Sequence, residues 1–221
     1  MTDKERIDSL ENVLARMLRP VAGIPFSAVI KALSGCRVIA IEDSREDREL
    51  MALLDQAAKR AGALVCQTPI RRPRPNEVGN DMEPFVLQGL RHVDIECSRP
   101  LTKSGLGRST GYPDILIRDK YGRYTYIECK IYSASTKNTT QRSFYLSPSE
   151  DFKVSHDARH VVFGYEMIAE PVGDGSRDSF YTPVSYSIID VHDLGCDVKY
   201  EFNSDNRRLY GIARTLAQGS I

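Results

Sequence analysis

The sequence predicts an α/β fold in which a mixed β-sheet is flanked by helices, and three features carry this prediction. Segments with helical spacing of apolar residues alternate along the chain with short runs rich in Val, Ile and Tyr, as is typical of α/β domains. The chain has 221 residues, 41% hydrophobic and 27% charged, which is ordinary for a globular protein with a sizeable core. No internal repeat or domain boundary is visible, so we expect a single domain over residues 1–221.

Residues 1–70 are expected to form an N-terminal extension that is mostly helical. Apolar residues at helical spacing predict an amphipathic helix over 3–19 and a short helix over 26–33. The run RVIAIED, residues 37–43, predicts a strand. Ser44 begins a longer helix, as its N-cap, and Gly62 is the expected stop after about residue 61.

The rest of the chain is expected to supply the sheet and one core helix. The proline-rich basic segment TPIRRPRP, residues 68–75, predicts a stiff loop that cannot join a central strand. A core helix follows over 75–91, with apolar residues on one face. Strands are then expected over 93–97, on both sides of a hairpin within 113–132, and over 160–169, 183–191 and 197–202.

The segment PDILIRDKYGRYTYIECKIY, residues 113–132, predicts a tight hairpin. Lys120-Tyr121-Gly122 suits a three-residue loop, because Gly122 can adopt the positive φ that such loops require. If the two residues that flank this loop face each other, Asp114 lies directly across from Glu128. Facing Cβ atoms in such a pair are about 4.5–5.5 Å apart.

Side chains alternate along a strand, so Lys130 lies on the same face as Asp114 and Glu128. The opposite face is expected to be the core side and contains Ile115, Ile117, Ile127, Cys129 and Ile131. Two facing carboxylates repel each other unless positive charge joins them. Lys130 supplies part of that charge, and a divalent cation such as Mg²⁺ suits the remaining oxygen ligands. The alternative is a surface hairpin with an ordinary Glu–Lys pair.

Charge and cysteine content narrow the function classes. The net charge is zero, which by itself argues against a nucleic-acid partner. Between residues 98 and 142, however, nine Lys or Arg residues stand against three acids, an asymmetry that attracts phosphate. The five cysteines are scattered without CxxC spacing, which predicts a reduced, cytoplasmic protein without a zinc site or disulfide frame. No apolar stretch approaches the length of a membrane span.

Pro113-Asp114, followed after thirteen residues by Glu128-Cys129-Lys130, resembles the PD-(D/E)xK nuclease superfamily. The upstream helix strengthens the resemblance, because Gly79 and Glu83 have the spacing found in the first core helix of that superfamily. The resemblance covers about residues 75–132 and implies a restriction-endonuclease-like core. The residues before and after that core, and the segments 143–167 and 198–211 in particular, resemble type II restriction endonucleases.

This resemblance implies a catalytic role for each residue of the motif. Asp114 and Glu128 would be ligands of Mg²⁺, with Mn²⁺ as a substitute, and the backbone carbonyl of Cys129 would be a third ligand. Lys130 would orient the attacking water and stabilise phosphate charge. The products would be DNA ends with 5′-phosphate and 3′-hydroxyl groups.

The third acid of the site is less well defined by the sequence. Glu83 is the residue that the resemblance selects, and a solvated helix glutamate is the alternative interpretation. Pro84 directly after it is awkward inside a helix. Glu77 is the other candidate acid on this helix.

The predicted substrate is double-stranded DNA, cut at a short specific sequence. The segments 68–75 and 98–112 flank the proposed site in sequence and should contact DNA. The candidate DNA-binding residues are Arg71, Arg72, Arg74, Lys103, Arg108, Ser109 and Thr110. Cutting both strands at a symmetric sequence favours a homodimer, with part of the interface drawn from residues 1–62. The alternatives are a Holliday junction resolvase or DNA repair nuclease of the same superfamily, and a non-catalytic DNA-binding protein.

Overall fold

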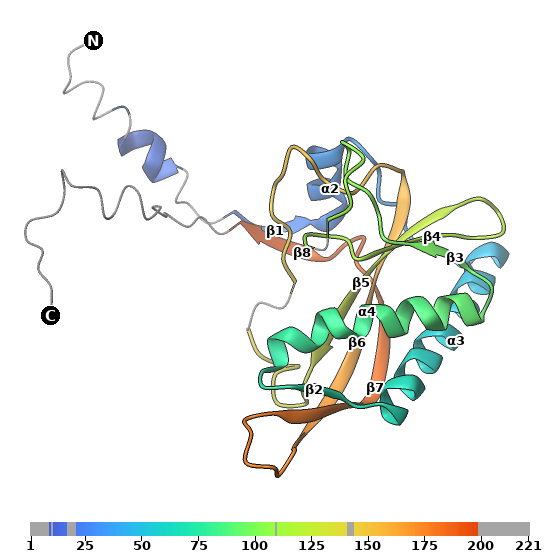
Figure 1. Cartoon of the computed structure of the whole chain (residues 1–221). Helices are drawn as coiled ribbons and strands as arrows, with labels where there is room; N and C mark the ends of the chain where they lie inside the picture. Colours follow the sequence, from blue (N-terminus) through green and yellow to red (C-terminus); the bar gives the residue numbers. More distant parts are fainter. Residues whose placement is uncertain (1–8, 10, 17–20, 109, 141–143, 199–221) are drawn as a thin grey trace, which may run out of the picture. The chain divides into compact units, whose positions relative to one another are not determined.

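The computed structural model of the chain describes residues 9, 11–16, 21–108, 110–140 and 144–198 (Figure 1). These residues fall into two units, each described by itself. The smaller unit joins residues from the two ends of the chain, where β1 (Val21–Pro25) and β8 (Gly195–Val198) form a two-stranded sheet. The larger unit, residues 25–195, contains the proposed site.

A six-stranded mixed sheet is the centre of the larger unit, with the strand order β2-β7-β6-β5-β4-β3. All neighbours in this sheet are antiparallel except β5 and β6, which are parallel. The strands are β2 (Ile70–Arg72), β3 (Glu96–Ser98), β4 (Ile115–Arg118), β5 (Tyr124–Tyr132), β6 (Ala158–Pro171) and β7 (Ser179–Asp190). The mixed sheet confirms the predicted fold class.

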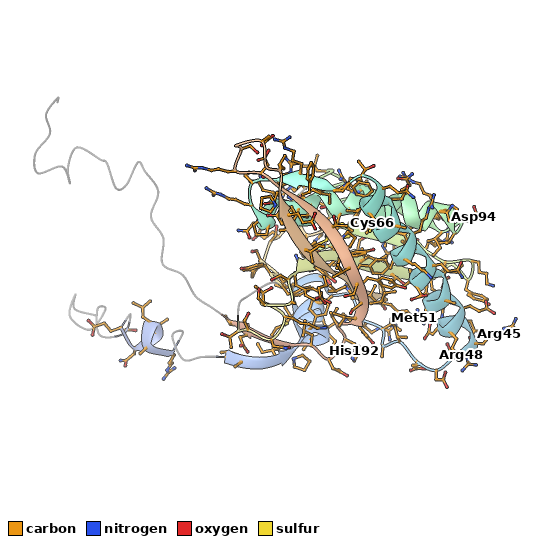
Figure 2. All side chains as sticks on the ribbon, turned by 90° about the horizontal axis from the view of Figure 1, so that it is seen from below. Arg45, Arg48, Met51, Cys66, Asp94 and His192 are labelled. Carbon is orange, nitrogen blue, oxygen red and sulfur yellow. The ribbon has the colours of Figure 1, made fainter. Side chains whose placement is uncertain are left out.

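Two long helices, α3 (Arg45–Gln67) and α4 (Pro75–His92), contribute with the sheet to one apolar core (Figure 1). Leu54 and Ala58 of α3 and Met82 and Val86 of α4 are fully buried in this core, as is Phe163 of β6. Figure 2 shows Arg45 and Arg48 pointing outward from the N-terminal end of α3. A third helix, α2 (Phe26–Ser34), confirms the short helix predicted over 26–33 and is capped by Gly35.

The start of α3 agrees with the sequence, and its end does not. The Ser44 hydroxyl accepts a hydrogen bond of 3.1 Å from the backbone N–H of Asp47, which is the predicted N-cap. The helix nevertheless continues through Gly62 to Gln67. It does so because Val65, one turn further on, is fully buried in the core. A Cβ at Gly62 would be 3.7 Å from the Tyr165 ring, an ordinary van der Waals contact.

The strand predicted over 37–43 is wrong. Only Val38 forms a β-bridge, to Ala158 at the first residue of β6, where the Ile39 N–H donates to the Ala158 carbonyl at 2.8 Å. The pairing of β7 with β6 begins at Val161, so the segment occupies the position beside β6 that β7 leaves open. The segment 68–75, predicted as a loop, contains the short strand β2. Because β2 lies at the edge of the sheet, the prediction that this segment cannot form a central strand holds.

The hairpin has the predicted register. Ile115 pairs with Ile127 and Arg118 with Tyr124, and Gly122 in the loop has a φ of 78°. The predicted core side is also confirmed, since Ile115, Ile117, Ile127 and Cys129 are buried and Ile131 packs against the same core.

The remaining expectations concern the ends of the chain. Most of the predicted helix over 3–19 and the end of the strand predicted over 197–202 lie outside the described residues. The apolar faces of α2 and α3 contain buried core residues, and the dimer interface expected to draw on residues 1–62 stays a prediction. Within the described part of the chain, no helix is long and apolar enough to cross a membrane.

Candidate active site

Asp114 and Glu128 come together because of the hairpin register. Asp114 immediately precedes β4, and the pairing of Ile115 with Ile127 places it beside Glu128. The Asp114 side chain is fixed there by the backbone N–H of Cys129, which donates to Asp114 Oδ2 at 2.8 Å. The sequence therefore predicted correctly that these two carboxylates are neighbours.

The same register leaves a backbone carbonyl beside the carboxylates. In an antiparallel pair, the N–H and C=O of one residue point to the same neighbour, so the Cys129 carbonyl points to the same side as the N–H that holds Asp114. Continued by two residues, the register places Pro113 opposite Cys129. Proline has no N–H to donate. The Cys129 carbonyl therefore lacks this ladder donor and can act as a ligand.

Glu128 is buried with only one of its two oxygens paired. Lys130 Nζ lies 2.6 Å from Glu128 Oε1, whereas Glu128 Oε2 has no hydrogen-bond partner. Burial and the nearby Asp114 carboxylate raise the pKa of Glu128 to about 7, although the Lys130 ammonium opposes the shift. Burial also raises the pKa of Asp114, against the effects of the Cys129 N–H and of Lys130. A buried carboxylate oxygen without a donor is unfavourable, and a bound water, an ion or a catalytic role can account for such a group.

Of the two candidate helix acids, the structure brings Glu83 to the site. Glu83 is buried, and Arg99, just after β3, donates to its Oε2 at 3.2 Å. Burial and the charge of Asp114 raise the pKa of Glu83. Glu77 is exposed. Pro84 lies inside a continuous α4 and does not break the helix.

Two basic residues of the cluster were missed by the sequence analysis, Arg99 and Lys153. Lys153 is only 4% exposed, and its Nζ donates to the carbonyls of Gly111 at 2.7 Å and Pro113 at 3.1 Å. Burial lowers its pKa, while the carboxylates of Asp114, Glu128 and Glu83 oppose that shift. The only sequence signal is that this lysine stands between Phe152 and Val154.

A cluster of aromatic side chains closes one side of the site. Phe26 of α2, Tyr112 and His160 of β6 contact one another with ring centroids 5.5–5.8 Å apart, and the Tyr112 hydroxyl lies 2.6 Å from His160 Nδ1. Tyr126, on the same face of β5 as Glu128, also packs against His160. Glu128, two residues after Tyr126 on this face of β5, is buried, whereas Lys130, two residues further along, is half-buried.

The residues present fit a hard divalent cation. Among the described residues, no three His, Cys, Asp or Glu side chains are gathered closely enough to enclose a metal ion by themselves. Mg²⁺, however, commonly takes only one or two protein carboxylates and completes its shell with water and substrate phosphate. Asp114, the unpaired Oε2 of Glu128 and the Cys129 carbonyl are the ligands that such a site would use.

The candidate DNA-binding residues lie in two places. Arg71 and Arg72 are on β2, at the edge of the sheet opposite β3. Arg71 donates to Asp174 and Asp178, and Arg72 donates to Asp81 at 2.6 and 2.8 Å.

Apart from Arg74, which follows β2, the other candidates lie in the glycine-rich loop over residues 98–112, which leads to Asp114. Lys103 and Thr110 are exposed, and Arg108 is paired with Asp151 at 3.2 Å. Ser109 lies outside the described residues. Arg74, at the N-terminus of α4, is exposed. The structure thus places Lys103, Arg108 and Thr110 on the same loop as Arg99, and the arginines of β2 on a different edge.

Comparison with known proteins identifies the family. A family model described as "Type II restriction enzyme MjaV family" matches residues 21–213. The type II restriction enzyme MjaV of Methanocaldococcus jannaschii is 35% identical over 226 residues, covering 95% of each chain. No solved structure matches the chain. The resemblance to type II restriction endonucleases that the sequence predicted is confirmed: the chain belongs to the type II restriction enzyme MjaV family, and is a site-specific endodeoxyribonuclease.

Proposed function

We propose that this restriction endonuclease hydrolyses DNA by the PD-(D/E)xK mechanism, with Asp114, Glu128 and Lys130 as catalytic residues and Mg²⁺ as the cofactor. The observation that carries the proposal is the buried, unpartnered Oε2 of Glu128 beside Asp114. An oxygen in this state is costly in a purely structural site and useful in one that binds a cation. Mn²⁺ should substitute for Mg²⁺, because the ligands are all oxygens.

The residues of the site have separate roles in this proposal. Asp114, Glu128 and the Cys129 carbonyl hold the cation, and Glu83 acts from α4 as a further acid of the site. A bound divalent cation supplies an activated water and neutralises charge on the scissile phosphate. The ammonium of Lys130 orients the attacking water and stabilises charge that develops on the phosphate. The expected products have 5′-phosphate and 3′-hydroxyl ends.

DNA binding follows from the family, and the proposed contacts follow from where the basic side chains lie. Lys103, Arg108 and Thr110 are proposed to contact DNA from the loop that carries Arg99. For Arg71, Arg72 and Arg74 we keep the same proposal, with the condition that the first two exchange their carboxylate partners for phosphate or a guanine edge. We also propose a cytoplasmic homodimer, because a two-fold axis gives each strand one site.

A plasmid digest tests the chemistry. Wild-type protein with Mg²⁺ or Mn²⁺ should give discrete fragments, and sequencing their ends should show 5′-phosphates at one short sequence. Ca²⁺ should support DNA binding with little cleavage. A smear would instead indicate a nonspecific nuclease, and full cleavage in excess EDTA would refute the metal mechanism.

Analytical ultracentrifugation tests the assembly. The protein should sediment as a dimer on a duplex that spans the mapped cut site. A monomer both with and without that duplex, still making clean double-strand cuts, would show that one subunit serves both strands and that the dimer proposal is wrong.

A further inference from the structure

Lys153 makes contacts that are unusual for a buried lysine. Its ammonium contacts none of the site's carboxylates directly and instead donates to two backbone carbonyls, those of Gly111 and Pro113. Burying an ammonium is unfavourable unless it is paired and hydrogen-bonded. The two carbonyls belong to the segment that leads directly into Asp114, so the lysine fixes the main chain at the point where the first catalytic carboxylate is presented.

The strand register explains why this contact matters. Asp119 N–H donates to the Arg123 carbonyl at 3.0 Å across the hairpin loop. Hydrogen-bonded pairs recur every second residue in an antiparallel ladder, so the pair Pro113–Cys129 would also be of this type. In a continued ladder, the Cys129 N–H would therefore donate to the Pro113 carbonyl.

The structure shows a different set of partners. The Pro113 carbonyl accepts from Lys153 Nζ at 3.1 Å, and the Cys129 N–H donates to Asp114 Oδ2 at 2.8 Å. By taking the Pro113 carbonyl, Lys153 leaves the Cys129 N–H available to the Asp114 carboxylate. One ladder hydrogen bond is thus replaced by two contacts, and the second of them sets where Asp114 points.

We propose that Lys153 is a positioning residue of the hydrolytic site, which holds the Gly111 and Pro113 carbonyls so that Asp114 is fixed in place to bind the divalent cation. This inference rests on the proposed function, in which Asp114 is a metal ligand. Lys153 acts through the main chain and through Asp114, and it does not contact the reacting atoms.

Lys153 is itself anchored by the two residues before it. The Phe152 carbonyl accepts from the Lys103 N–H at 2.9 Å, and the Asp151 carboxylate accepts from the N–H and hydroxyl of Ser104 at 2.8 and 2.9 Å. Residues 151–153 therefore connect the glycine-rich loop to the segment before Asp114. Outer contacts of this kind commonly change metal affinity by about 10- to 100-fold when removed.

Metal binding by the full-length protein tests the proposal without depending on cleavage. Free Mn²⁺ is measured by electron paramagnetic resonance in titrations of the wild type and of Lys153→Met. Loss of positioning should weaken Mn²⁺ binding by about 10- to 100-fold. If the lysine acted only through its positive charge, its removal would instead strengthen Mn²⁺ binding, because the charge repels the cation. Unchanged or tighter Mn²⁺ binding would therefore overturn the proposal.

Further variants separate positioning from folding and from the proposed function. Lys153→Gln replaces Lys153→Met in this test if Lys153→Met does not fold. Its side chain is polar, uncharged and shorter than lysine, so it should also weaken Mn²⁺ binding. Lys153→Arg, which keeps donors and charge, should restore binding to within about threefold of wild type. Lys59→Met, at an exposed position of α3, is the matched control and should bind as wild type does.

If Lys153→Met binds Mn²⁺ as wild type does, Asp114→Asn shows whether the role of Lys153 or the metal site itself is wrong. If Asp114→Asn abolishes Mn²⁺ binding and cleavage while Lys153→Met leaves Mn²⁺ binding intact, the metal site stands and only the role of Lys153 is wrong. If Asp114→Asn binds Mn²⁺ and cuts as wild type does, the proposed metal site itself is wrong.

Discussion

Two clusters of buried charge lie at different places along the hairpin, and their carboxylates are in opposite states. At the loop end of the hairpin, Asp47 of α3 is 1% exposed, and its Oδ1 accepts from Arg123 at 2.9 Å and from Arg159 at 2.7 Å. Its Oδ2 accepts from the Glu42 N–H at 2.9 Å. These partners outweigh the effect of burial and lower the pKa of Asp47.

At the other end of the hairpin, burial and mutual repulsion dominate. Burial raises the pKa of Asp114, Glu128 and Glu83, and one oxygen of Glu128 has no partner. Basic side chains are present there too, but none satisfies that oxygen. The difference teaches that burial of charge does not by itself mark a functional site. The mark is a buried carboxylate that the fold leaves incompletely satisfied.

The largest expected effect is on cleavage by Glu128→Gln. This change keeps the shape of the side chain but removes the charge of the proposed metal ligand, so we expect the cleavage rate with Mg²⁺ to fall on the order of 1,000-fold or more. Because the carboxylates repel one another without metal, the melting temperature in EDTA should be equal to or above that of wild type. Single-turnover cleavage and thermal unfolding provide the two measurements. Cleavage at the wild-type rate would remove Glu128 from the site.

Asp47→Asn should show the reverse pattern. It leaves the buried Arg159 and the half-buried Arg123, which keeps Asp119 as a partner, without their shared carboxylate. Removing one partner of a buried ion pair costs about 3 kcal/mol or more. We therefore expect the melting temperature to fall by roughly 6–12 °C. Cleavage at a temperature where the variant is folded should stay within a few-fold of wild type. If cleavage is lost while the protein remains folded, the two clusters do not separate structure from chemistry.

The pH dependence of stability should have opposite signs for the two clusters. A carboxyl whose folded pKa is raised binds a proton that the unfolded chain releases, so its contribution falls as pH rises between the ordinary value of 4.5 and about 7 for Glu128. The pKa of Asp47 is lowered, so its contribution is lost only as pH falls below the ordinary value of 3.8.

Urea unfolding in EDTA at pH 5 and pH 8 checks this sign. Wild type should lose about 1–3 kcal/mol relative to Glu128→Gln between these two pH values, since each unit of pKa shift corresponds to about 1.4 kcal/mol. An equal pH dependence in the two proteins would mean that Glu128 is not desolvated in the folded state.

The part of the site that could be predicted from sequence is the part set by local geometry. A three-residue loop and the alternation of a strand are enough to place Asp114 beside Glu128 and Cys129 on the core side. The helix N-cap at Ser44 was predictable for the same reason, since the hydrogen bond joins residues three apart.

The contacts that could not be predicted join segments far apart in sequence. Lys153 reaches Gly111 from a stretch without periodicity, forty-two residues away, and Arg99, just after β3, reaches Glu83 of α4. The two errors in the helices and strands have the same origin. Gly62 would end an isolated helix, but packing of Val65 in the core overrides it. The segment RVIAIED forms only the bridge from Val38 to Ala158 and no longer pairing with a neighbouring strand.

The smallest expected effects concern the arginines at the surface and sharpen the comparison at the level of DNA binding. Arg71 is fully engaged with Asp174 and Asp178, as Asp47 is with its partners, whereas Arg108 has a single contact at 3.2 Å in the loop beside the carboxylates. An arginine that must first leave two carboxylates gains little from a phosphate.

Arg108→Ala should weaken binding to all duplexes by about five- to tenfold and reduce the slope of log affinity against log salt by about one. Arg71→Ala should weaken binding less, by about two- to threefold, because Arg71 must give up two carboxylates to contact DNA. Fluorescence anisotropy with a cognate and a scrambled duplex, at several salt concentrations without metal, measures both. If Arg71→Ala leaves the affinity for both duplexes unchanged, the β2 edge lies outside the DNA interface and the contact proposed for Arg71 is wrong.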